Sequence, residues 1–149
     1  MSPEPPVTAS VLSAPPARIH RSDVVVMEQT AADELPAIQA LWPAFERVVG
    51  LRGRKMFARA DERAGTYTVC TPVKPGDRPE ELGLRTGVLP GGWYLRGTLV
   101  GAPELIYGRI AGGMAELRRA APLDETRPLV EFYRRHGHIE LWLPVEEHA

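Results

Sequence analysis

The chain has 149 residues, enough for one domain with a sizeable core, and carries a formal charge of −1 with an isoelectric point near 6.4. This balance gives no electrostatic case for direct binding of nucleic acid or of an acidic membrane. No apolar run approaches the roughly 18 residues of a membrane span. Cys70 is the lone cysteine, which excludes an internal disulfide. We therefore expect a soluble, cytoplasmic protein.

The first 21 residues differ in composition from the rest. They hold five prolines together with Ser, Thr and Ala, and no apolar period runs through them. We expect a flexible tail over residues 1–21 and a single domain over residues 22–149. The expected domain contains only one serine, Ser22 at its edge, so a Ser-His-Asp mechanism is excluded.

The first half of the domain predicts a strand, a helix and a hairpin. Residues 23–29 form a β-branched run that is typical of a strand. Residues 35–49 repeat apolar side chains at spacings of three and four, which predicts an amphipathic helix with Trp42 in the core. Strands are expected at residues 55–60 and 66–73, and residues 74–81 predict a loop between the halves.

The second half repeats this order. A strand is expected over residues 91–100 and a helix over residues 103–120. A hairpin of residues 127–135 and 138–145 then turns at His136-Gly137. Two strand-helix-strand-strand units predict an α+β fold, with a mostly antiparallel sheet and two helices on one face. The other face would then be solvated, covered by a partner, or form a ligand cleft.

Glu131 interrupts a strand that is otherwise apolar and aromatic. Period-2 alternation points Leu129, Glu131 and Tyr133 to one side of this strand, and Val130 and Phe132 to the other. Burying a carboxylate costs several kcal/mol unless it is paired or hydrogen-bonded. Two interpretations stay open: an exposed or arginine-paired acid, or an acid that serves a ligand.

Aromatic residues on the expected strands offer rings to such a site. They are Tyr67 in the first hairpin, Trp93 and Tyr94 on the strand that follows the loop, and Tyr133 and Trp142 in the last hairpin. A cleft with several rings and one carboxylate suits flat and often cationic molecules. The predicted ligand-binding set is therefore Glu131 with these five residues. Any single ring among them can equally fill the core, and the pattern does not tell whether Trp93 or Tyr94 faces the cleft.

No metal site and no cofactor are predicted. His136 and His138 flank Gly137, which is typical of a turn rather than of a metal site. The pairs Gly91-Gly92 and Gly112-Gly113 lack the frame of a phosphate-binding loop.

Three segments carry a resemblance to a known family. Val88-Leu-Pro-Gly-Gly-Trp-Tyr94, Arg127-Pro-Leu-Val-Glu-Phe-Tyr133 and Ile139-Glu-Leu-Trp-Leu-Pro-Val145 resemble the GyrI-like (gyrase-inhibitor-like) small-molecule-binding domains. This family is similar to the effector-binding domain of multidrug-sensing transcription regulators. The resemblance covers about residues 22–147, and the Arg-Pro-x-x-Glu-x-Tyr run is its most specific part. It implies two units related by a pseudo-twofold axis, a ligand cleft across the sheet, and Glu131 at the position where the sensors meet cationic aromatic ligands.

The resemblance implies three possible functions. The first is binding of aromatic compounds, cationic ones among them, for drug resistance or sensing. The second is a hydrolase that opens strained cyclopropane rings of DNA-alkylating natural products, with Glu131 and Tyr133 as catalytic residues and Glu131 holding or deprotonating a water. The third is an interaction with gyrase or another protein partner, whose identity the sequence does not give.

Overall fold

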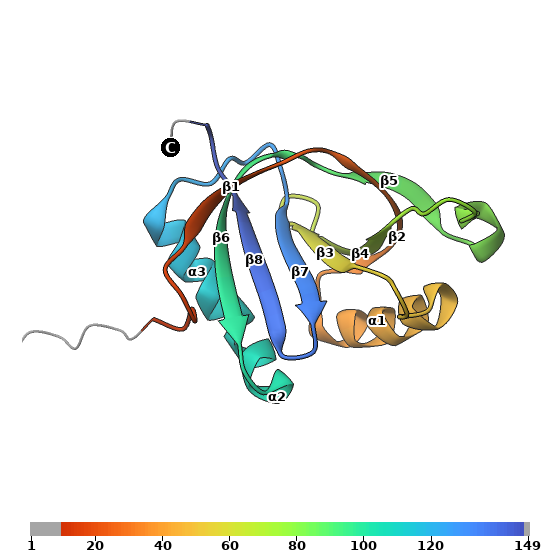
Figure 1. The fold of residues 1–149 in the computed structure, drawn as a ribbon, viewed down its shortest axis with the longest axis horizontal. Coiled ribbons are helices and arrows are strands. Elements are labelled where there is room, and N and C mark those ends of the chain that lie inside the picture. Colours follow the sequence, from red (N-terminus) through yellow and green to blue (C-terminus); the bar gives the residue numbers. More distant parts are fainter. Residues whose placement is uncertain (1–9, 148–149) are drawn as a thin grey trace, which may run out of the picture.

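A computed structural model describes residues 10–147 of the chain. Its elements, in chain order, are β1 (Ala17–Arg21), β2 (Val24–Ala32), α1 (Leu35–Val49), β3 (Met56–Asp61), β4 (Thr66–Pro72), the 3-10 turn η1 (Pro79–Leu82), β5 (Arg85–Leu89), β6 (Gly92–Val100), α2 (Pro103–Ile106), the 3-10 turn η2 (Tyr107–Arg109), α3 (Ile110–Ala120), β7 (Leu129–Arg135) and β8 (His138–Pro144). The predicted α+β fold is confirmed, and Figure 1 shows the arrangement of these elements.

One curled antiparallel sheet contains all eight strands, in the order β1-β6-β8-β7-β3-β4-β2-β5. The first predicted unit supplies β2, α1, β3 and β4, and the second supplies β6, the α2–α3 helical segment, β7 and β8. Within the sheet the two units run in mirrored order and meet where β3 pairs with β7. The predicted internal repeat is therefore present in the topology, and its junction is the β3–β7 pair.

The sequence did not predict β1 or β5, and both strands lie at the sheet edges. β1 comes just before β2 in the chain but pairs with β6, whereas β5 comes just before β6 but pairs with β2. The strand that precedes each unit in the chain thus pairs with a strand of the other unit. Residues 10–21 belong to the folded part, since they include β1 and the buried Leu12, and the flexible tail expected there is a wrong prediction. Residues 1–9 of the expected tail lie outside the described residues.

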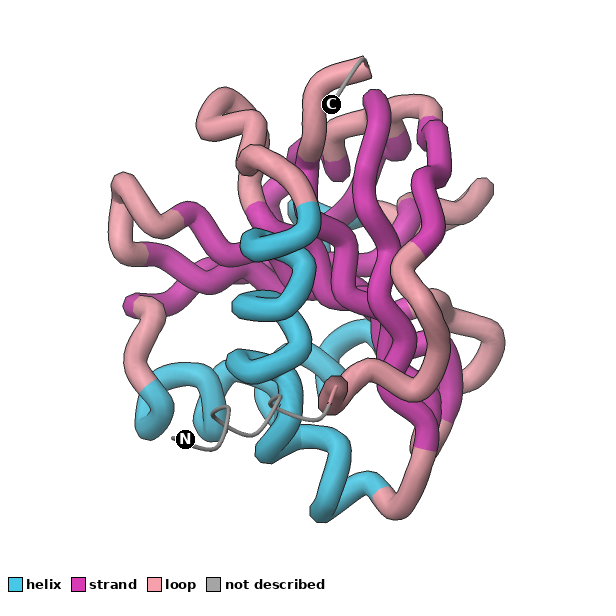
Figure 2. The backbone as a smooth tube through the Cα atoms, turned by 90° about the vertical axis from the view of Figure 1, so that its left-hand side faces the viewer, coloured by secondary structure: helices cyan, strands magenta, loops and turns pink. Residues whose placement is uncertain are grey.

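The two longer helices, α1 and α3, pack on the same face of the sheet. Phe45 of α1 packs on Met27 and Val69 in one apolar cluster, while Leu117 of α3 packs on Leu99 in another. The cluster on the opposite face contains strand residues only. In the side view of Figure 2, strands extend behind and to both sides of α3.

No helix within residues 10–147 is both long enough and apolar enough to cross a lipid bilayer.

Two adjacent glycines of α3 have opposite roles. Gly113 is buried against the sheet, where an added Cβ would lie 2.7 Å from Leu141 Cδ1 and 3.1 Å from Leu12 Cδ2. Gly112 is exposed, and its added Cβ would only make ordinary contact with Val11, at 3.5 Å. Gly113 therefore allows a close helix–sheet approach, whereas Gly112 only lowers the helix propensity.

We predict opposite stability changes for the two alanine substitutions. Gly112→Ala should raise the free energy of unfolding by about 0.5–1 kcal/mol, because it removes backbone entropy from the unfolded state without a clash. The free energy of unfolding of Gly113→Ala should be about 1–3 kcal/mol lower than that of Gly112→Ala, because the new methyl overpacks a buried contact. Urea unfolding of both variants measures this difference. Equal stabilisation by the two alanines would contradict the packing assigned to Gly113.

Candidate functional site

Glu131 lies on β7, at the junction of the two units. Its registered neighbours are Ala58 on β3 and Leu141 on β8. Leu129 and Tyr133 pack against the helix-bearing clusters, while Val130 and Phe132 pack in the opposite one, so the predicted alternation is confirmed.

Two tyrosine hydroxyls hold one oxygen of the Glu131 carboxylate. Tyr67 OH donates to Oε1 at 2.8 Å, and Tyr133 OH donates to the same oxygen at 2.7 Å. Trp42 Nε1 in turn donates to Tyr67 OH at 3.1 Å. The four residues come from α1, β4 and β7, and we refer to them as the Glu131 cluster.

No cation neutralises this carboxylate within the described part of the chain. None of the ion pairs formed by residues 10–147 includes Glu131. Its second oxygen, Oε2, accepts no hydrogen bond from these residues. Oε2 still keeps accessible surface, because Gln29 Oε1 is the only fully buried side-chain polar atom in this range without a partner. The cluster therefore presents one acceptor atom with free hydrogen-bonding capacity.

Burial shifts the acid–base properties of the cluster. Desolvation raises the pKa of Glu131 above its ordinary value, against the lowering effect of the Tyr133 and Tyr67 hydrogen bonds, and the charge of Asp33 raises it further. Burial, together with the charge of Glu131, also raises the pKa of Tyr67 and Tyr133. Both hydroxyls stay protonated near neutral pH and remain donors to the acid.

Aromatic rings surround the acid on the helix side. The Trp42 and Tyr133 rings meet edge to face, with centroids 4.8 Å apart, and the half-exposed Tyr107 of η2 lies 6.3 Å from Tyr133. The sequence placed Trp42 in the core, and its ring does pack against the α1 cluster, but its N–H also reaches Tyr67. A Trp within an apolar helix stripe needs a partner for its N–H, which is the sequence signal for this contact.

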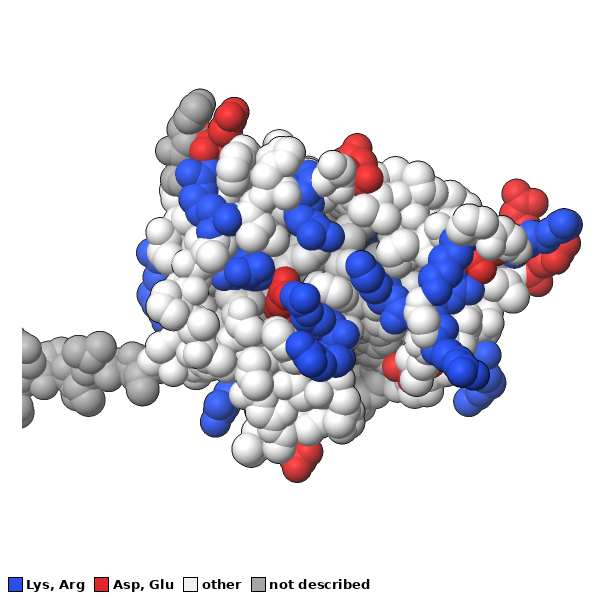
Figure 3. Space-filling view, viewed as in Figure 1, with Lys and Arg blue, Asp and Glu red and all other residues white. Residues whose placement is uncertain are grey.

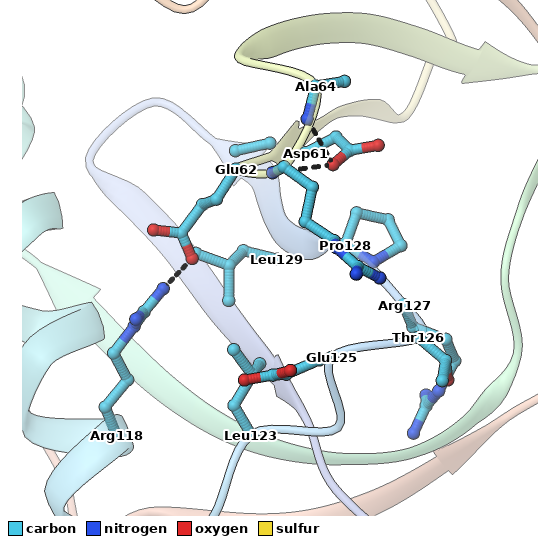
Figure 4. A pocket seen from close by; sticks show the side chains of 12 residues that line it. Asp61, Glu62, Ala64, Arg118, Leu123, Glu125, Thr126, Arg127, Pro128 and Leu129 are labelled. Carbon is cyan, nitrogen blue, oxygen red and sulfur yellow. Dashed lines mark hydrogen bonds and ion pairs between the residues drawn. The ribbon is translucent and has the colours of Figure 1, made fainter.

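A hollow of about 620 Å³ lies where β3 ends and β7 begins, and it is lined by residues of the β3–β4 turn, of α3 and of the loop before β7 (Figure 4). Its apolar lining includes Leu129 and Ala60, which pair across β7 and β3 two residues along from Glu131 and Ala58. Glu131 itself does not line this hollow. Charged residues also line the hollow, and among them Arg118 of α3 and Glu62 of the β3–β4 turn form an ion pair.

Three of the predicted ligand-binding residues do not join the Glu131 cluster. Trp93 packs on the α3 side and lies 5.1 Å from His20, centroid to centroid. Tyr94 and Trp142 are fully buried in the cluster on the helix-free face. The candidate acid therefore lies on the helix-bearing face, rather than on the opposite face where the sequence analysis expected the cleft.

Arg127, the first residue of the recognised Arg-Pro-x-x-Glu-x-Tyr run, fixes the entry to β7. It donates to the carbonyl oxygens of Gly91, Trp93 and Val145 at 3.2, 2.9 and 2.8 Å. Its guanidinium also lies 4.8 Å from the centre of the Tyr94 ring. Arg127 thus ties the start of β7 to β6 and to the end of β8, which sets the register that places Glu131.

Comparisons with known proteins show the fold. No protein-family model matches the chain, and no curated protein matches it. An integron cassette protein from Vibrio cholerae superposes with a TM-score of 0.68 at 13% identity, over 88% of this chain and 95% of the other. SAV2435, in a structure bound to tetraphenylphosphonium, superposes with a TM-score of 0.61 at 15% identity over 91% and 96%. A hydrolase from Listeria innocua superposes with a TM-score of 0.52 at 13% identity, over 93% of this chain and 94% of the other.

We predict that Glu131→Gln stabilises the protein, and increasingly so at higher pH. Because the folded-state pKa of Glu131 is raised, the wild-type protein loses stability as the pH rises above the unfolded value of about 4.5 and through the folded pKa. Glutamine keeps an oxygen that can accept from both tyrosines but carries no charge. In urea unfolding from pH 4 to pH 8, the difference in the free energy of unfolding between Glu131→Gln and the wild-type protein should grow with pH and then level off.

The exposed Glu80 of η1 offers a control of equal charge change. Glu80→Gln should show no such trend. A wild-type protein that is less stable than Glu131→Gln at pH 4, and more stable at pH 8, would contradict the raised pKa.

Proposed function

We propose that this protein is a GyrI-like domain that binds aromatic, cationic small molecules at the Glu131 cluster. One observation carries the proposal: the carboxylate is recessed among rings and hydrogen-bonded by neutral hydroxyls, yet has no cationic partner among the described residues. A carboxylate in this setting costs free energy, which either protonation or a positive charge from a ligand recovers. The shared fold of SAV2435, whose structure contains the aromatic cation tetraphenylphosphonium, supports the proposal.

The aromatic rings near Glu131 are the second feature that suits an aromatic cation. Trp42, Tyr133 and the half-exposed Tyr107 lie around the acid, and ring faces attract both apolar groups and cations. Ala58 beside Glu131 is a small, fully buried residue of the α1 cluster, and Ala60, two residues further along β3, lines the neighbouring hollow. A flat or propeller-shaped cation fits this combination better than a small hydrated ion, because its charge is spread over apolar surface.

We predict that the charge of Glu131 discriminates between cationic and neutral ligands. Wild-type protein should bind tetraphenylphosphonium more tightly than the neutral triphenylphosphine oxide. Glu131→Gln should weaken phosphonium binding by about tenfold or more, because it removes a desolvated charge pair, and should leave the neutral compound within about twofold. Isothermal titration calorimetry measures both affinities.

The matched control is again Glu80→Gln, which changes the net charge equally. Its phosphonium affinity should equal that of the wild-type protein. If the two glutamine variants weakened phosphonium binding alike, the effect would be one of overall charge, and the site assignment would be wrong.

A hydrolase that opens strained rings is the second candidate. Its specific support is the free Oε2 of Glu131 on a carboxyl whose pKa is raised, which makes it a better base than a solvated one. In this reaction Oε2 takes a proton from water as the water oxygen attacks a ring carbon. The breaking C–C bond passes its electrons to a conjugated carbonyl, which is then protonated. The fold shared with a hydrolase from Listeria innocua agrees with this candidate.

We predict a simple separation of the two candidates by mass spectrometry after incubation with cyclopropane-containing electrophiles. A binding protein returns the compound unchanged, whereas a hydrolase returns it with the mass of one added water. If water is added, Glu131→Gln should reduce the rate by at least about a hundredfold, since general base catalysis contributes about 10²–10⁴. Addition of water that survives in Glu131→Gln would remove Glu131 from the mechanism. The gyrase or protein-partner alternative stays a prediction from the sequence resemblance.

A further inference from the structure

The helix-free face of the sheet carries a separate cluster of charged and aromatic side chains. Alternation along the strands brings Arg21 of β1, Arg96 of β6 and Arg134 of β7 to this face, around Trp142 of β8. In the view of Figure 3, basic side chains gather over the middle of the sheet around a small acidic patch.

A buried acid organises part of this cluster. Glu140 is only 4% exposed; its Oε1 accepts from Trp142 Nε1 at 3.0 Å, and its Oε2 accepts from Arg134 Nη1 at 2.8 Å. The Arg21 guanidinium lies 5.0 Å from the centre of the Trp142 ring. Glu140 therefore orients Arg134, and the buried indole supports Arg21 through a cation–π contact.

The positive charge of this cluster is not balanced within the described residues. Arg96 is the cross-strand neighbour of Trp142 and makes no ion pair or side-chain hydrogen bond with residues 10–147, and neither does Arg21. Arg134 is half exposed and uses only one nitrogen on Glu140. Three guanidinium groups thus face one carboxylate, which leaves a net charge of about two for an anion to satisfy.

A ring platform lies next to these arginines. Phe132 is the cross-strand partner of Glu140, with its ring centroid 5.9 Å from that of Trp142. It stacks on the buried Phe57 at 4.4 Å with an interplanar angle of 13° and keeps part of its own surface exposed. Phe132 and Arg134 are two residues apart on β7, so their side chains point to the same face of the sheet.

We propose that this face binds a nucleotide, with its phosphates on Arg96, Arg134 and Arg21 and its base over Phe132. Arginine presents a planar fork of donors that matches phosphate oxygens, and charge-assisted pairs of this kind are the strong hydrogen bonds of proteins. Aromatic side chains stack on any base, because every base has a π-face. The site is distinct from the Glu131 cluster, because Phe132 and Glu131 point to opposite faces of β7.

The proposal is tested by calorimetric titration of the full chain at low salt. The three titrants are adenosine triphosphate, inorganic triphosphate and a single-stranded oligothymidylate. Adenosine triphosphate should bind saturably, and Arg96→Gln and Arg134→Gln should each weaken it by about tenfold. Arg119→Gln, which removes an exposed charge from α3, should leave it unchanged, and so should Glu131→Gln. Phe132→Leu should weaken the nucleotide but not inorganic triphosphate, which separates stacking from phosphate binding.

Thermal unfolding of each variant verifies that it is folded. The nucleotide assignment is overturned by the absence of saturable binding to the wild-type protein, or by equal losses in Arg96→Gln and Arg119→Gln. It is also overturned if the oligothymidylate binds but adenosine triphosphate does not, because the face would then bind an extended strand.

Discussion

The structure of the candidate site depends on a carboxylate held by two neutral hydroxyls and no cation. Tyr67 and Tyr133 both donate to Oε1 of Glu131, and this arrangement fixes the position of the oxygen without adding a positive charge beside it. A guanidinium in the same place would cancel the charge. Glu140 and Glu28 show this alternative within the same molecule, since arginines neutralise both. The difference between these acids is the main physical reason to assign a ligand to Glu131.

The symmetry of the fold explains why the site lies where it does. The two units meet at the β3–β7 pair, and each helical segment covers its own half of the sheet. Tyr133 contacts both apolar clusters, so the Glu131 cluster lies at the boundary between them. The units are not equal there, because β7 supplies the acid while β3 supplies Ala58 directly opposite.

Local patterns were sufficient for most elements and for the orientation of the key strand. The spacing of three and four identified α1, and period-2 alternation placed Glu131 and Tyr133 on one face of β7. Such patterns do not report which face of the sheet the helices cover. For that reason the sequence could separate Trp93 from Tyr94 but could not tell that neither joins the acid.

The errors of prediction also have physical causes. β1 and β5 are short edge strands of five residues, and each gains its stability from pairing with a strand distant in the sequence. The preceding prolines and the weak alternation of these segments favour a tail and a loop. The contact of Trp42 with Tyr67 depends on how α1 packs on the sheet, which is tertiary information.

The most direct test of the account is the pKa of Glu131 itself, followed through the carboxyl carbon by NMR in protein labelled with carbon-13 at glutamate. The account predicts a pKa above the ordinary value of about 4.5 in the free protein. It also predicts that saturating tetraphenylphosphonium lowers this pKa, because a bound cation favours the charged form. A pKa at or below 4.5 in the free protein, unchanged by the phosphonium ion, would contradict the claim that Glu131 binds a cationic ligand.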